Sequence, residues 1–129
     1  MANPTDIRDS TRRKANTHFT ASEQRDAMVK NHTTYFKPWD AIHESNPIEI
    51  LQRHEPAGLV PLLIMQGALD DNMLPAAQAK FVAAYKAAGG DIQYEVFEGS
   101  EHEWVATPGP QTDRAREMVK AFIARQLRG

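Results

Sequence analysis

The sequence predicts an α/β fold in which parallel strands are covered by helices. Two observations from the second half of the chain support this prediction. The run from Pro61 to Gly67 is short and mainly apolar, a pattern typical of a strand buried on both faces of a parallel sheet. An amphipathic stretch over residues 75–88 and an alternating stretch over residues 91–97 follow it. A segment of that length between two strands is sufficient for a right-handed parallel crossover.

The composition is that of one ordinary globular domain. The chain has 129 residues, of which 41% are hydrophobic and 25% charged, with a net charge of −2. Because it has no cysteine, disulfides, thiolate zinc sites and cysteine nucleophiles are excluded. No basic face suits nucleic acid, and the longest apolar run, residues 59–65, is too short to span a membrane. The start of the chain carries no signal-peptide core, so we expect a cytoplasmic protein by default.

Three segments differ in character. Residues 1–19 are polar and are expected to form an amino-terminal arm. Residues 20–58 are expected to form a helix and an irregular, cap-like lead-in. Residues 59–129 carry the clear strand–helix–strand–helix pattern.

The lead-in begins with a helix signal. Thr20 and Glu23 have the spacing of a capping box, which predicts a helix over residues 21–33, although its apolar content is small. Residues 34–58 are broken by three prolines and are expected to form a loop with one or two helical turns, one of them at residues 48–51.

The helix predicted over residues 75–88 has signals at both ends. Pro75 suits a first helical turn, and Gly89-Gly90 suits a stop. Its expected buried face repeats at the helical period. That face consists of Ala77, Phe81, Ala84, Tyr85 and Ala88.

The last two elements follow directly. Residues 91–97 alternate apolar and polar side chains, as in a strand with one wetter face. A loop rich in glycine and proline over residues 98–111 then leads to Thr112, which can cap a helix over residues 113–127. The predicted buried stripe of that helix consists of Ala115, Met118, Val119, Phe122 and Ile123.

An acid and a histidine follow the two predicted strands. Asp70 and Asp71 come after the first strand, and His102 comes after the second. Parallel strands end at the same edge of a sheet, so these side chains are expected to meet there. A carboxylate that orients an imidazole is the acid–base part of a nucleophile relay. Asp70 is the expected partner of His102, and a simple turn-forming role is the alternative for Asp70 and the preferred one for Asp71.

From about Pro47 onward the chain resembles the carboxyl-terminal part of an α/β-hydrolase. The similarity lies in the motifs PLLIMQGALDDNMLP at residues 61–75 and YEVFEGSEHEW at residues 94–104. They are similar to esterases of the hormone-sensitive-lipase and feruloyl-esterase-like types and to prolyl-oligopeptidase-like peptidases. The resemblance implies that Asp70 is the catalytic acid and His102 the catalytic histidine. A glycine usually follows that histidine in the family, whereas this chain has Glu103.

The nucleophile of such a site is missing from the sequence. The family orders its triad as nucleophile, acid and histidine, with the serine on a Gly-x-Ser-x-Gly elbow. None of the four serines has that setting, and no histidine-glycine-glycine stretch for an oxyanion hole is present. The serines are Ser10, Ser22, Ser45 and Ser100.

We therefore expect the carboxyl-terminal part of a serine hydrolase that is inactive without its nucleophile half. A carboxylic ester is the favoured substrate class. A prolyl-oligopeptidase-like peptidase fragment and a non-catalytic, oligomeric remnant of the fold are the alternatives. Because two strands alone are marginal and a flat apolar edge invites pairing, we also expect a homo-oligomer or association with the missing half. No nucleic-acid or membrane partner and no cofactor is expected.

The remaining patterns indicate packing. Three His-Glu pairs, beginning at His43, His54 and His102, lack the spacing of a zinc-binding helix, so no metal site is predicted. The aromatic cluster of Tyr35, Phe36 and Trp39 is expected to pack in the lead-in, with a substrate-pocket wall as the alternative.

Overall fold

The computed structural model describes residues 21–128, with side chains from residue 26 onward. The arm predicted over residues 1–19 and the capping box at Thr20 and Glu23 lie outside the described side chains. The described elements, in chain order, are α1 (Ala21–Tyr35), η2 (Trp39–His43), α2 (Pro47–Gln52), β1 (Leu62–Gly67), α3 (Pro75–Ala87), β2 (Ile92–Phe97), η3 (Trp104–Ala106) and α4 (Pro110–Arg128).

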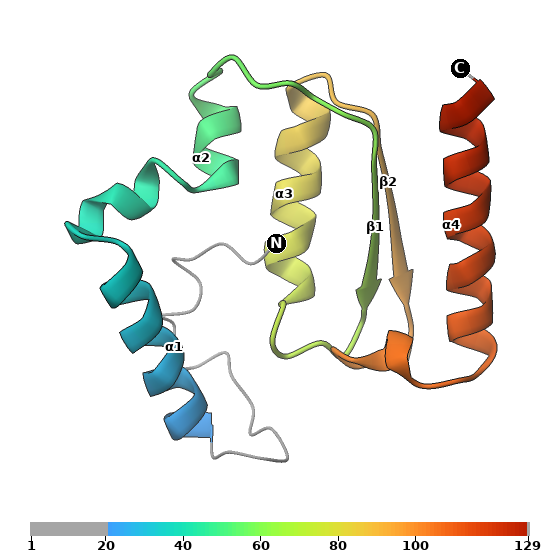
Figure 1. Ribbon diagram of the computed structural model, residues 1–129, viewed down its shortest axis with the longest axis horizontal. Coiled ribbons are helices and arrows are strands. Elements are labelled where there is room, and N and C mark those ends of the chain that lie inside the picture. The colour runs from blue at the N-terminus through green and yellow to red at the C-terminus, as the bar shows by residue number, and fades with distance from the viewer. Residues whose placement is uncertain (1–20, 129) are drawn as a thin grey trace.

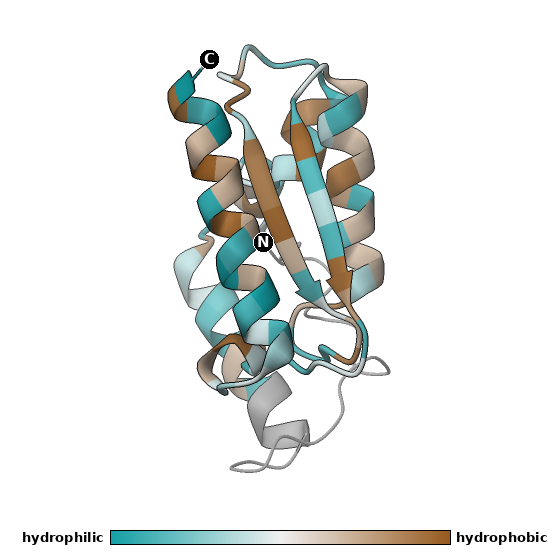
Figure 2. Ribbon diagram, turned by 90° about the vertical axis from the view of Figure 1, so that its right-hand side faces the viewer, coloured by the Kyte–Doolittle hydropathy of each residue, from teal (hydrophilic) through white to brown (hydrophobic). Residues whose placement is uncertain are grey.

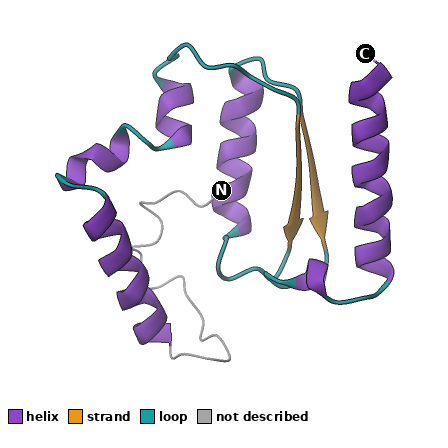
Figure 3. Cartoon of the chain, in the orientation of Figure 1, coloured by secondary structure: helices purple, strands orange, loops and turns teal. Residues whose placement is uncertain are grey.

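The two strands pair in parallel, as the sequence predicts. Their register runs from Leu62 opposite Ile92 to Gly67 opposite Phe97. Helix α3 covers one face of this sheet and α4 lies over the other, so the second half of the chain has three layers (Figures 1 and 3). Both strands point toward the same end of the molecule, where the loops that follow them lie together (Figure 1).

Helix α3 begins and ends where its sequence signals predict. Pro75 occupies the first turn, and Gly89 follows the helix with φ of 88°. Such a left-handed residue is favourable for glycine. At Gly90, a Cβ atom would lie 2.1 Å from the ring of Tyr85. The second glycine therefore lets the chain pass close to that ring.

The main core cluster lies between α2, α3 and the sheet. It joins Leu51 of α2, Val82 and Tyr85 of α3, and Ile92 of β2. The Tyr85 hydroxyl donates a hydrogen bond of 2.5 Å to the carbonyl of Val60, which satisfies the polar end of a buried aromatic. Beside this cluster, burial raises the pKa of the Tyr94 phenol above its usual value of 10.0.

Strand β1 is less buried than its apolar sequence predicts. Leu62 to Met65 are only half-buried, and full burial begins at Gln66. Within the described residues β1 pairs with β2 alone, which leaves its other edge unpaired. Figure 2 shows one strand hydrophobic over most of its length and the other with alternating character. In this two-stranded sheet each strand has one unpaired edge among the described residues, and the unpaired edge of β1 belongs to the more hydrophobic strand.

Helix α4 starts earlier than predicted, because Pro110 fits its first turn. Thr112 therefore lies inside the helix, and its prediction as the cap is wrong. Of the predicted buried stripe, Ala115 is buried, whereas Ile123 remains 51% exposed. The sheet has only two strands among the described residues, so it covers only part of the apolar stripe of α4.

The lead-in is helical over more of its length than predicted. Helix α1 continues to Tyr35, and the expected turn near residue 48 is the short helix α2. The aromatic cluster forms, since the ring of Phe36 contacts those of Tyr35 and Trp39, although Tyr35 is 81% exposed. No described helix is both long and apolar enough to cross a membrane.

Candidate active site

The carboxyl ends of β1 and β2 bring an acid and a histidine together. The Nδ1 atom of His102 lies 2.9 Å from Oδ2 of Asp70, within hydrogen-bonding distance. Asp71 is half-buried, and Asp70 is the acid in contact with the imidazole. The expected contact is therefore present, and the catalytic roles of the two residues stay predictions.

Asp70 uses its two oxygens for different purposes. Oδ1 accepts hydrogen bonds from the backbone nitrogens of Asn72 and Met73, at 2.9 and 2.7 Å. Oδ2 is directed to His102. The turn-forming role and the acid role that the sequence left open for Asp70 are thus compatible, because each role takes one oxygen. With only 7% of the side chain exposed, the carboxylate has a fixed orientation.

His102 has the geometry of an oriented base. A carboxylate oxygen only accepts, so Nδ1 carries the proton that is shared with Asp70. In the neutral ring this leaves Nε2 with a lone pair that can accept a proton from a nucleophile. The side chain is 43% exposed, so a substrate or another polypeptide segment can reach the ring.

The loops after the two strands approach each other very closely. The backbone nitrogen of Leu69 donates to the carbonyl of Ser100 at 2.9 Å, and that of Ala68 donates to the carbonyl of Phe97 at 3.0 Å. A Cβ atom on Gly67 would lie 2.5 Å from the carbonyl oxygens of both Ser100 and Glu101. Glycine at position 67 therefore allows two loops to lie in contact. They are the histidine loop, residues 98–109, which carries His102, and the acid loop, residues 68–74, which carries Asp70.

Sequence reasoning missed a supporting residue, Gln66. This side chain is buried, and its Nε2 donates to the carbonyls of Gly67 and Met73 at 3.0 and 2.9 Å. It links the end of β1 to the loop that holds Asp70. A polar residue at the end of an otherwise apolar strand was the available signal.

A cavity of about 360 Å³ opens beside the acid–histidine pair. Its walls include the β1 segment from Leu63 to Gly67, together with Asp70, His102 and Trp104. The cavity therefore extends from the His102 side chain along strand β1.

No serine is placed as a nucleophile by the described part of the chain. Ser100 is buried in the histidine loop, and Ser45 is exposed just before α2. Neither stands on a strand-to-helix elbow. The side chains of Ser10 and Ser22 lie outside the described residues.

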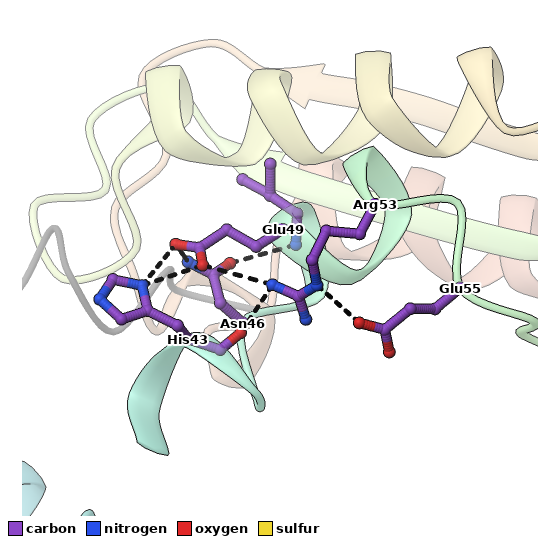
Figure 4. Close-up of polar contacts among 6 residues, drawn as sticks. His43, Asn46, Glu49, Arg53 and Glu55 are labelled. Atoms are coloured by element: carbon purple, nitrogen blue, oxygen red, sulfur yellow. Dashed lines mark hydrogen bonds and ion pairs between the residues drawn. The ribbon is translucent and has the colours of Figure 1, made fainter. Parts of the chain in front are cut away.

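A second polar cluster surrounds the short helix α2 (Figure 4). Nδ1 of His43 lies 2.9 Å from Oε2 of Glu49, and Asn46 Nδ2 donates to Oε1 of the same glutamate at 2.8 Å. Arg53 donates to the carbonyl of His43 and to Glu55. These contacts join η2 to α2. The partner of His43 is thus Glu49 and not the adjacent Glu44.

Among residues 26–128, whose side chains the structure describes, acids and histidines form no group of three or more that could hold a metal ion.

Comparison with known proteins gives the family. The model of the prolyl oligopeptidase family matches residues 8–129, nearly the whole chain. The chain belongs to this family, which is a branch of the α/β-hydrolase superfamily. No curated protein and no solved structure matches the chain.

Proposed function

We propose that this chain supplies the acid, Asp70, and the general base, His102, of a serine-hydrolase site. The observation that carries the proposal is the 2.9 Å contact between a buried carboxylate and an accessible imidazole at the end of a parallel sheet. Membership of the prolyl oligopeptidase family supports the same chemistry. A non-catalytic remnant would have no need of this pair.

The proposed reaction is acyl transfer through a serine. The serine Oγ attacks the carbonyl carbon of the substrate while Nε2 of His102 takes the hydroxyl proton, and Asp70 stabilises the imidazolium that forms. The imidazolium then gives its proton to the leaving amine or alcohol as the carbonyl–heteroatom bond breaks. A water molecule, deprotonated by the same histidine, then attacks the acyl-enzyme. The acyl–Oγ bond breaks, the imidazolium returns the proton to Oγ, and the acid product leaves.

The nucleophile and the oxyanion hole are assigned to another polypeptide segment. The cavity beside His102 is lined by β1, whose other edge is unpaired in the described residues, so a strand added there in parallel would bring its carboxyl end toward the imidazole. We propose a segment with a Gly-x-Ser-x-Gly elbow as the occupant of this edge. Such a segment would also cover the half-buried residues Leu62 to Met65.

For the substrate, we propose a peptide bond, because the family match points to peptidases. The carboxylic ester favoured by the sequence motifs uses the same acyl-enzyme chemistry, which makes it a useful reporter. The two classes are distinguished by comparing peptide p-nitroanilides with p-nitrophenyl esters on the completed enzyme.

The isolated chain should hydrolyse neither class above background. Without an elbow serine and an oxyanion hole, the acid–base pair has no nucleophile to activate. The measurement combines p-nitrophenyl acetate hydrolysis with labelling by a serine-reactive phosphonate. Co-expression with the nucleophile-bearing half of a family member should restore both signals. Stoichiometric labelling of Ser45 or Ser100 in the isolated chain would contradict the proposal.

The isolated chain should also associate with itself or with its completing segment. An open apolar strand edge is prone to pairing, and a two-stranded sheet is marginal by itself. Size-exclusion chromatography coupled to light scattering, at micromolar protein concentration, measures the molar mass of the chain in solution. A stable monomer near 14.5 kDa would show that the open edge of β1 needs no partner.

A further inference from the structure

The loop that carries His102 is held at both ends by the start of α4. At its beginning, Gln111 Nε2 donates to the carbonyl of Glu98 at 2.9 Å. At its end, the hydroxyl of Thr112 lies 3.3 Å from the carbonyl of Trp104 and 2.5 Å from that of Thr107. Two consecutive side chains of one helix thus fix the carbonyls on either side of the histidine.

An aromatic stack strengthens the same connection. The ring of Trp104 stacks on the fully buried ring of Phe97, with 4.3 Å between centroids and 26° between planes. The guanidinium of Arg114 lies 4.8 Å from the centre of the Phe97 ring and pairs with Glu95 of β2. The end of β2, the histidine loop and the first turns of α4 therefore form one packed unit.

His102 depends on this unit for its position. Its side chain is 43% exposed, and the polar contact described for its ring is the one to Asp70. The direction of the ring is then set mainly by the backbone of the loop. Movement of that backbone away from Asp70 by about 1 Å would take Nδ1 out of hydrogen-bonding distance from Oδ2.

We infer that Gln111 and Thr112 are positioning residues that hold His102 in the tautomer and orientation required of a general base. The catalytic consequence rests on the proposed function, whereas the effect on the imidazole does not. The helix α4 thus serves the site through its first turn, in addition to covering the sheet.

The test is the tautomer of His102, read from the ring ¹⁵N chemical shifts of the full chain by NMR. In the unmodified chain the Nδ1-protonated form should dominate. Gln111→Ala and Thr112→Val should each increase the fraction with an open Asp70–His102 contact about fivefold, the effect of losing one ordinary hydrogen bond. Thr112→Ser keeps the hydroxyl, so its His102 ring signals should match those of the unmodified chain.

Matched controls separate this role from general destabilisation. Gln126→Ala changes an exposed glutamine of the same helix, and Thr33→Val removes a threonine hydroxyl bond in α1. Neither should alter the His102 signals. Unchanged tautomer populations in Gln111→Ala and Thr112→Val, measured well below the unfolding temperature, would overturn the inference. A shifted tautomer with no activity after completion by a nucleophile segment would leave the inference standing and refute the proposed function.

Discussion

Asp70→Asn should reduce kcat/KM of the completed hydrolase by about four orders of magnitude, the effect expected when the histidine is held in the wrong tautomer. The Oδ1 atom of asparagine can still accept the two backbone hydrogen bonds from Asn72 and Met73, so the turn should survive. Its amide group would face His102 and donate to Nδ1. The proton of the ring would then move to Nε2, where it blocks proton transfer from the serine.

Two readouts check this prediction. Peptide p-nitroanilide hydrolysis measures the activity, and ring ¹⁵N shifts of the isolated chain report the tautomer. Asp71→Asn is the matched control, since it changes the adjacent carboxylate, which is not the one in contact with His102. Equal losses of activity in the two variants, or an unchanged tautomer in Asp70→Asn, would remove Asp70 from the proposed triad.

Gly67→Ala should lower the free energy of unfolding by about 1–3 kcal/mol, the usual cost of inserting an extra carbon into a packed site. The new Cβ would lie 2.5 Å from the carbonyl oxygens of Ser100 and Glu101. Both are backbone atoms, so the histidine loop as a whole must move. Because His102 directly follows Glu101, the Asp70–His102 contact should open as well.

Gly58→Ala is the control for this variant. A Cβ atom at Gly58 has no neighbour within 4 Å, and this position should accept alanine with little change. Urea unfolding gives the stabilities of both variants, and the His102 ring signals report the contact. A Gly67→Ala chain with unchanged stability and an intact contact would show that the loop accommodates the added carbon freely.

Much of the site could be predicted from local patterns. An apolar run that ends in glycine identified β1, and an aspartate three residues later and a histidine after the next strand identified the pair. Short sequence patterns were sufficient to predict the pair because parallel strands direct the loops that follow them to the same edge of the sheet. The limits of α3 were also predictable, since Pro75 and Gly89 act through their own backbone geometry.

Contacts that depend on distant carbonyls were not predictable. Thr112 looked like a helix cap, yet its hydroxyl donates to the histidine loop, and nothing in its neighbouring sequence distinguishes the two roles. Gln66 and Gln111 likewise find partners on segments whose proximity is a product of packing.

The sequence by itself determined the parallel strand–helix–strand–helix order, the Asp70–His102 pair and the absence of an elbow serine, because each is written in residue type and spacing. The tertiary structure decided which oxygen of Asp70 forms the turn and which contacts the histidine. It also decided that α4 holds the histidine loop at both ends and that β1 keeps an open edge in the described residues. These features depend on distances between segments far apart in the chain, which only packing can set.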